Sequence, residues 1–271
     1  MSGFSPNYRY FIDPENGIHI EIEGSLKKFN PKLLNIGNLK APSKPIEVLS
    51  VVFDLEGFTN FTSQIDPQLS IPNYISEFFH WLFRQIRTEL KVPGKENIMW
   101  AELPFFSKFM GDGALFLWKI DLDKIKNSAE DISPADLKNR TNESVCNIVA
   151  TMYEICKDYG KFYKLAETNY TSTPKKLRCG IARGNVFPIG NGLDFVGPCI
   201  NIASRLQKFN GLSFTFSARG IAKSGFSPEY ASEFRKKRVS IRGIGDGELI
   251  FVLKDEFNQL PDDLKSNFID V

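Results

Sequence analysis

The feature that most constrains the fold is an almost continuously apolar segment, residues 46–53, which is followed directly by Asp54. Only Glu47 and Ser50 interrupt the apolar run. Strands with apolar side chains on both faces are typical of the middle of a sheet that is covered on both sides. The segment therefore predicts a central β-strand with a carboxylate held rigidly at its end.

A second carboxylate has a similar setting. Residues 103–109 and 114–120 are strand-like segments on either side of Gly-Asp-Gly, and they predict a β-hairpin with its turn at Asp112. Aspartate and glycine are common in turns, so each aspartate taken alone fits a structural role equally well. Two carboxylates on neighbouring strands, however, form a natural cradle for Mg²⁺ or Mn²⁺. The two segments together predict a metal site suited to phosphoryl chemistry.

The remaining sequence alternates strand and helix patterns. Residues 8–23 predict a β-hairpin, and residues 73–91 carry apolar side chains on one helical face. A second helix begins at Ser133 and continues to Ile155, and a third spans residues 198–209. Further strands are predicted at residues 177–182, 185–189, 212–217, 238–242 and 248–253. Hairpins mixed with crossover helices indicate an α+β fold of the ferredoxin-like type, with helices packed on a mixed, antiparallel-rich sheet.

Composition narrows the class of protein. The chain has 34 basic and 32 acidic residues and no basic block, so a nucleic-acid surface is not expected. No apolar run approaches the length of a membrane span, and the first residues lack the features of a signal peptide. A cytoplasmic protein without a membrane partner is therefore expected. The four cysteines are widely spaced, which favours reduced thiols over disulfides or a metal site.

Five blocks of sequence resemble class III nucleotidyl cyclases. Residues 53–59 and 108–112 resemble the two metal motifs of that family, 177–184 its strand–glycine–strand hairpin, 194–206 its signature helix, and 242–245 its late phosphate-contacting strand. The blocks occur in the order of the family. The resemblance implies a catalytic domain at residues 46–254, after a hairpin and connector at 1–45. Residues 255–271 are predicted to form a polar, loosely packed C-terminal tail.

The resemblance implies a role for the residues of the metal and helix motifs. Asp54 and Asp112, with the carbonyl oxygen of Leu55, are expected to bind two divalent cations per site, Mn²⁺ or Mg²⁺. Asn201 is expected to orient the ribose, and Arg205 to stabilise the charged phosphorus centre. The last two residues are four positions apart and share one helix face, and a guanidinium binds phosphoryl oxygens in a bidentate manner. The alternative for this pair is a solvated helix face.

The nucleotide-binding residues implied by the resemblance are Phe58, Lys108, Asp194 and Arg242. Arg242 matches a basic residue that contacts the terminal phosphates, with a surface strand arginine as the alternative. A lysine–aspartate pair in adenylate cyclases reads the adenine edge, so Lys108 and Asp194 favour ATP over GTP. A short chain with an N-terminal hairpin also resembles bacterial pyrimidine cyclases of antiphage systems, which make cyclic UMP or cyclic CMP. A lysine donates equally well to a uracil or cytosine carbonyl.

The resemblance also implies the partners. In the family, the metal residues of one subunit face the base and transition-state residues of another, so a homodimer with two shared sites is expected. The substrate is a nucleoside triphosphate, and the expected product is a 3′,5′-cyclic nucleotide that a downstream cyclic-nucleotide-sensing effector detects. We expect a pyrimidine cyclase, with an adenylate cyclase as the first alternative. A catalytically inactive nucleotide-binding dimer and a diguanylate-cyclase-like enzyme are less favoured.

Overall fold

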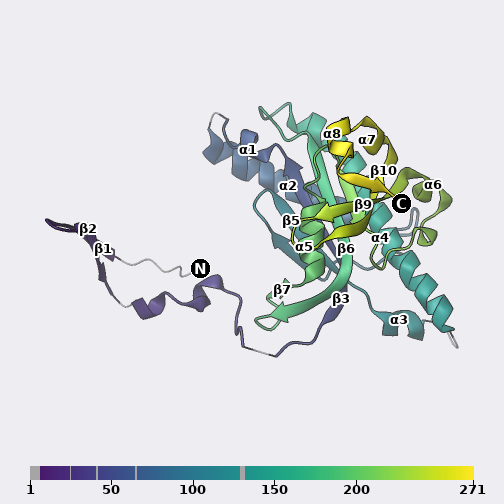
Figure 1. Ribbon diagram of the computed structural model, residues 1–271, viewed down its shortest axis with the longest axis horizontal. Coiled ribbons are helices and arrows are strands. Elements are labelled where there is room, and N and C mark those ends of the chain that lie inside the picture. The colour runs from purple at the N-terminus through teal and green to yellow at the C-terminus, as the bar shows by residue number, and fades with distance from the viewer. Residues whose placement is uncertain (1–6, 25, 41, 65, 129–131) are drawn as a thin grey trace. The chain divides into compact units, whose positions relative to one another are not determined.

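The computed structural model describes residues 7–24, 26–40, 42–64, 66–128 and 132–271, and its contacts divide the chain into two compact units. The hairpin unit comprises Phe187–Val196 together with the described residues up to Lys44. The sheet unit comprises Pro45–Val186 and Gly197–Val271. Figure 1 labels the helices and strands of both units. Among the described helices, none is long and apolar enough to cross a bilayer.

The hairpin unit begins with the predicted β-hairpin. Strands β1 (Asn7–Asp13) and β2 (Gly17–Glu23) pair in antiparallel register, which confirms that prediction. Two short 3₁₀ helices follow, η1 (Leu26–Lys28) and η2 (Pro31–Leu34). The unit also contains the end of β6 (Lys176–Ile189), which pairs with β7 (Asp194–Val196).

The sheet unit is built on one large sheet in which β3 is central, as predicted. Its other strands are β4 (Phe106–Phe109), β5 (Gly113–Lys119), β8 (Phe214–Ser217), β9 (Phe234–Ile241), β10 (Gly245–Leu253) and β11 (Phe268–Asp270). The strand order is β11-β9-β10-β8-β6-β3-β5-β4, and among these described strands only the β6–β8 pair is parallel. Strand β3 spans Ile46–Glu56, so Asp54 lies inside the strand and not at the expected end.

The three predicted helices are present as α2, α4 and α5, although their ends differ by several residues, and the other described helices are short and were not predicted. The described helices are α1 (Phe58–Phe61), α2 (Pro67–Glu89), α3 (Leu122–Asn127), α4 (Pro134–Ala166), α5 (Pro198–Leu206), α6 (Pro228–Glu233), α7 (Lys254–Gln259) and α8 (Asp262–Lys265). Ser133 caps α4, because its hydroxyl oxygen accepts a hydrogen bond from the Asp136 N–H at 3.1 Å. The combination of helices and a mainly antiparallel sheet confirms the predicted α+β class.

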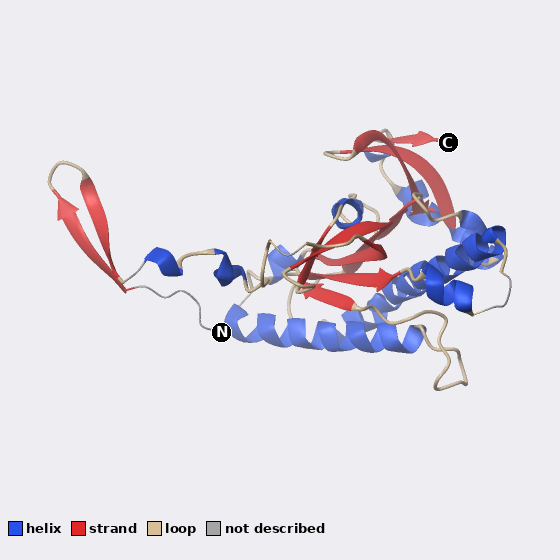
Figure 2. Cartoon of the chain, turned by 90° about the horizontal axis from the view of Figure 1, so that it is seen from below, coloured by secondary structure: helices blue, strands red, loops and turns tan. Residues whose placement is uncertain are grey.

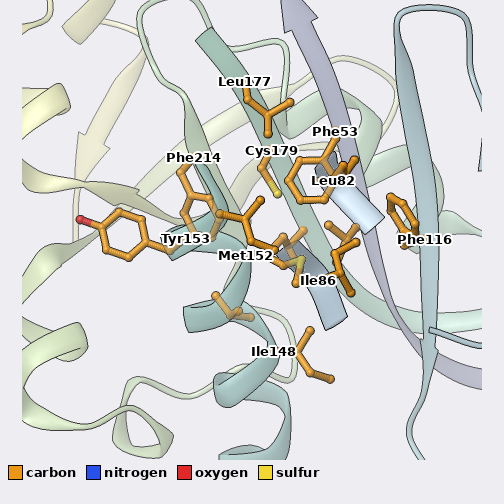
Figure 3. Close-up of a cluster of buried hydrophobic side chains, with 14 of the residues drawn as sticks. Phe53, Leu82, Ile86, Phe116, Ile148, Met152, Tyr153, Leu177, Cys179 and Phe214 are labelled. Atoms are coloured by element: carbon orange, nitrogen blue, oxygen red, sulfur yellow. The ribbon is translucent and has the colours of Figure 1, made fainter. Parts of the chain in front are cut away.

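The two long helices, α2 and α4, cover one face of the sheet (Figure 2). Alternate residues of β3, including Phe53, point to this face and join one apolar cluster with both helices. Figure 3 shows Leu82 and Ile86 of α2 and Met152 of α4 among the side chains of this cluster. Burial of so many large side chains is the main stabilising contribution to the sheet unit.

The opposite face of the sheet packs against α5, and two glycines of β6 allow the close approach. A Cβ atom on Gly180 would lie 2.1 Å from the Ala203 carbonyl oxygen, and one on Gly184 would lie 3.1 Å from Cys199 Cβ. Residues 177–189 were expected to form two strands around a turn at Gly184, and this prediction is wrong. Strand β6 is continuous, because the glycine accommodates a helix instead of a turn.

Residues after Asp255 also differ from the expected loosely packed tail. Helix α7 buries Phe257, and β11 pairs with β9 in antiparallel register at one edge of the sheet. The ring of Phe268 in β11 lies 5.5 Å from that of Phe257, centroid to centroid. This segment therefore extends the sheet and protects an edge strand.

Candidate active site

The structure places Asp54 and Asp112 on neighbouring parts of β3 and of the β4–β5 hairpin. Asp54 is opposite Gly113 of β5, and the N–H of Leu55 donates to the carbonyl oxygen of Asp112 at 3.2 Å. A Cβ atom on Gly113 would lie 2.1 Å from the Phe53 carbonyl oxygen, so only glycine allows the hairpin to approach β3 this closely. The Gly-Asp-Gly segment thus places the second aspartate beside the first.

An arginine that the sequence motifs did not assign completes this group. Arg178 of β6 is opposite Asp54, and its Nε and Nη2 atoms both donate to Asp54 Oδ2, the former at 3.1 Å. The side chains are 19% and 14% exposed, respectively. Asp54 lies on the α5 side of the sheet, because Phe53 and Leu55 point into the α2–α4 cluster. Asp54 therefore has a counter-ion from its own chain.

The electrostatics of Asp112 show that the two carboxylates interact. Burial raises the pKa of Asp112, and the nearby charge of Asp54 raises this pKa further. Arg178 and Lys208, which follows α5 in the sequence, lower the same pKa in part. A divalent cation between the two carboxylates would stabilise their ionised forms, because its charge offsets the repulsion that raises the pKa of Asp112.

Asn201 and Arg205 lie on the exposed side of α5. Ile202, Ala203 and Leu206 of this helix are buried against the sheet, whereas both predicted catalytic side chains are exposed. Within the described part of the chain, no hydrogen bond or ion pair joins either side chain to Asp54 or Asp112. A single copy therefore presents the carboxylates and the α5 residues without direct contact between them.

Phe58 and Asp112 line the same cavity, which has a volume of about 470 Å³. Phe58 begins α1 directly after Gly57, whose φ of 87° favours glycine. The other lining residues are Thr59, Thr62, Ile71, Pro72, Ile75, Phe109 and Gly111. A larger cavity of about 820 Å³ lies between α4, α6 and the segment after α2, and it contains none of the predicted site residues. We place the candidate site at the smaller cavity, because Asp112 lines it and Asp54 is nearby, although the other cavity has the larger volume.

The remaining predicted residues occupy four separate positions. Leu55 is buried with its side chain in the core, and Lys108 is exposed on β4 opposite Leu115. Arg242 is exposed in the turn between β9 and β10, one residue beyond the end of β9 and not inside the strand predicted at residues 238–242. Asp194 is half-buried at the start of β7 in the hairpin unit, where its Oδ1 accepts from the Phe195 N–H at 2.8 Å.

The Arg178→Met variant should lower the free energy of unfolding of the metal-free protein by about 1–3 kcal/mol, because Asp54 loses its charged partner. Added Mn²⁺ should then stabilise this variant more than the wild-type protein, because no side-chain cation competes for Asp54. Urea unfolding with EDTA and with Mn²⁺ measures both effects.

Arg183→Met is the matched control for this experiment. Arg183 lies on the same strand and donates to Glu47 Oε1 at 2.8 Å, so its removal also breaks an ion pair on β3. We expect Mn²⁺ to stabilise this control only as much as the wild type. Equal stabilisation of the two variants by Mn²⁺ would show that Arg178 does not compete with the metal.

Solved nucleotidyl cyclases are similar to this chain in structure. Two structures of a bacterial light-regulated adenylyl cyclase superpose with TM-scores of 0.53 and 0.52, each at 14% sequence identity. The alignments cover 80% and 85% of this chain, and 54% and 60% of those proteins. The guanylyl cyclase Cya2 aligns over 79% of this chain and 94% of its own, at 16% identity and a TM-score of 0.48.

Sequence comparison adds no closer relative, since no family model and no curated protein matches the chain. The chain spans little more than half the length of the light-regulated cyclases, and at these identities the similarity concerns the fold. On that evidence, this protein has the α+β fold of class III cyclase catalytic domains.

Proposed function

We propose that the protein is a class III nucleotidyl cyclase, which converts a nucleoside triphosphate to a 3′,5′-cyclic nucleotide and pyrophosphate. The observation that carries the proposal is the juxtaposition of Asp54 on β3 with Asp112 in the turn of the adjoining β4–β5 hairpin of a cyclase-like fold. The catalytic domain is assigned to residues 46–254. A fold alone does not determine which reaction a protein catalyses, so the proposal depends on the residues of the site. This site contains the two carboxylates that a metal-dependent cyclisation requires.

The donor set fits a divalent cation. Asp54 and Asp112 provide hard oxygen ligands whose repulsion a dication would relieve. Among the described residues, no group of three or more His, Cys, Asp or Glu side chains surrounds a potential metal position. Mg²⁺ is commonly bound by one or two carboxylates plus substrate phosphates, so two carboxylates and the Leu55 carbonyl are a sufficient protein contribution. Bound Mg²⁺ or Mn²⁺ would lower the pKa of the attacking hydroxyl and neutralise the triphosphate.

The protein residues have distinct roles in the proposed reaction. The ribose 3′-oxygen forms a bond to the α-phosphorus, its proton is lost to solvent, and the bond from that phosphorus to the β-phosphate oxygen breaks. Asn201 orients the ribose for this in-line attack. Arg205 donates to the phosphoryl oxygens on which charge develops, and Arg242 binds the terminal phosphates. Phe58 lines the cavity beside Asp112 and shields the triphosphate from water.

The active form is proposed to be a homodimer with two shared sites. Asn201 and Arg205 are exposed on α5 and make no direct contact with the carboxylates of their own chain within the described residues. A twofold dimer places the α5 residues of one copy opposite Asp54 and Asp112 of the other, twice. Each site then contains the metal residues of one subunit and the ribose- and phosphate-binding residues of its partner.

The proposed substrate is a pyrimidine nucleotide, UTP or CTP, and the product is a second messenger of antiphage defence that a cyclic-nucleotide-sensing effector detects. Lys108 on β4 donates to the base carbonyl, and Asp194 accepts from the base. ATP is the second candidate, because the same two side chains match the adenine edge and the light-regulated neighbours are described as adenylyl cyclases. A cytoplasmic location and a downstream effector are parts of this proposal, and the fold alone does not imply them.

Purified protein with Mn²⁺ and each of the four nucleoside triphosphates separately tests the proposal. Cyclic UMP or cyclic CMP, identified by mass spectrometry together with pyrophosphate, is the expected product. Asp112→Asn serves as the inactive control, because it lacks one of the two carboxylates of the proposed metal site. Exclusive formation of cyclic AMP would replace the pyrimidine assignment with the adenylate one, and no cyclic product from any nucleotide would contradict the cyclase proposal.

A further inference from the structure

The hairpin β1–β2 has an apolar face that the described chain leaves exposed. Side chains of alternate strand residues share a face. One face contains three cross-strand pairs: Tyr8 with Ile22, Tyr10 with Ile20, and Ile12 with Ile18. Tyr10 is 67% exposed, Ile12 79% and Ile18 73%. A two-stranded hairpin is only marginally stable alone in water, so this face is a candidate docking surface.

The hairpin is also strongly acidic. Residues 7–23 contain one basic residue, Arg9, and four acidic residues, Asp13, Glu15, Glu21 and Glu23. The hairpin is two strands wide, so carboxylates on its polar face lie at edges that also border the apolar face. A partner surface that covers the apolar face should therefore carry apolar residues flanked by positive charge.

The connector after the hairpin, residues 24–44, has this complementary character. It contains five lysines and no acidic residue. Lys28 and Lys32 are exposed, and so are Leu33 (39%) and Leu34 (63%). Asn30 caps the short helix η2, because its Oδ1 accepts from the Lys32 N–H at 3.0 Å. The cap holds the two leucines and the lysine in one turn of structure.

We propose that the hairpin of one copy docks on the connector of a second copy of this chain, and that the contact is reciprocal. Both surfaces belong to the hairpin unit, and the side chains named above are exposed there, so among the described residues of one chain these side chains do not bury one another. In a twofold dimer the same contact forms twice, which doubles its contribution. The 22 residues 24–45 separate the hairpin from β3; fully extended they would span about 70 Å, and although η1 and η2 shorten this reach, a linker of this length allows contact with a neighbouring subunit.

This exchange goes beyond the proposed function and adds a second contact to its homodimer. The catalytic contact involves α5 and the carboxylates, whereas the exchange involves only residues of the hairpin and connector. Substitutions in the exchange surfaces therefore test it without altering residues assigned to the active site.

A charge-swap experiment tests the exchange. The first variant carries Glu21→Lys and Glu23→Lys, so both its hairpin and its connector are basic. The second carries Lys28→Glu and Lys32→Glu, so its hairpin stays acidic and the part of the connector around the two leucines, residues 26–34, changes from three positive charges to a net negative charge. We expect each variant alone to dimerise at least tenfold more weakly than the wild type, by sedimentation velocity at low salt. In an equimolar mixture every exchanged contact joins opposite charges, so dimerisation should recover.

Two outcomes overturn the exchange. If neither variant changes the dissociation constant, the hairpin is not part of the dimer, while the catalytic homodimer is unaffected. If both variants dimerise weakly and mixing restores nothing, the charges act within one chain or on another partner. Lys126→Glu with Lys138→Glu, on exposed positions of α3 and α4, controls for net charge and should leave dimerisation unchanged.

The two faces of the hairpin provide an independent control that does not involve charge. Ile20 lies on the apolar face, and Phe11 lies on the other face, where its ring stacks on His19 at a centroid distance of 5.6 Å. Ile20→Ser should weaken dimerisation severalfold, and Phe11→Ser should not. Equal effects of the two substitutions would show that the apolar face is not the docking surface.

Discussion

Asp54→Asn and Asp112→Asn are each expected to lower kcat by about a thousandfold or more, because each removes a carboxylate from the proposed metal site and several kcal/mol of charge stabilisation with it. The measurement is cyclic-nucleotide formation with saturating Mn²⁺ and the preferred triphosphate. Retention of even a tenth of the wild-type kcat in either variant would contradict the two-metal proposal.

Stability measurements on the same variants separate a catalytic from a structural role. The pKa of Asp112 is raised in the folded protein, so its ionised form destabilises the fold above the pKa of the unfolded state. This cost is relieved as the pH falls through the raised pKa. Asp112→Asn should therefore leave the metal-free protein at least as stable as the wild type at pH 7, with the difference vanishing in acid. Urea unfolding with EDTA at several pH values measures the trend.

Glu47→Gln is the matched control for loss of activity. Glu47 lies on β3, as Asp54 does, and it also pairs with an arginine of β6, Arg183. The Glu47→Gln substitution breaks an ion pair of the same type. Glu47, however, lies near the start of β3, whereas Asp112 lies beside the end of this strand. We expect near wild-type kcat from Glu47→Gln. A loss as large as that of Asp54→Asn would indicate that the strand and not the metal site is being disturbed.

The local sequence predicted the elements whose signals are local. The apolar run before Asp54 identified the central strand β3, and the Gly-Asp-Gly segment identified the β4–β5 hairpin that holds Asp112. Periodicity located α2, α4 and α5. These features follow from hydrophobic spacing and turn chemistry over a few residues, which a single sequence displays directly.

The features that sequence alone did not predict depend on contacts between distant segments. Arg178 pairs with Asp54 only because β6 is antiparallel to β3 in one particular register, and register is set by the whole sheet. Gly184 resembled a turn residue, but its position is explained by Cys199 of α5. The residues after Asp255 are polar in sequence, yet β11 finds a partner strand in β9. Each case requires knowledge of what lies opposite in space.

The shared-site dimer makes the second large prediction. Asp54→Ala and Arg205→Ala should each abolish turnover alone, but an equimolar mixture should recover about a quarter of the wild-type activity. Random exchange makes half of the dimers mixed. In a mixed dimer, one site receives both substitutions and the other receives neither, so half of the sites in half of the dimers are intact.

Subunit exchange must be demonstrated independently, by mass spectrometry of differently tagged copies under native conditions. A mixture of Asp54→Ala with Asp112→Ala is the matched control, because both changes lie in the metal half of the site. Every site in its mixed dimers still lacks one carboxylate, so no recovery is expected. Recovery confined to the Arg205→Ala mixture therefore locates Arg205 and Asp54 of one functional site on different subunits. An inactive mixture with exchange complete would instead place all the catalytic groups within one chain, and the exposed side of α5 would need another role.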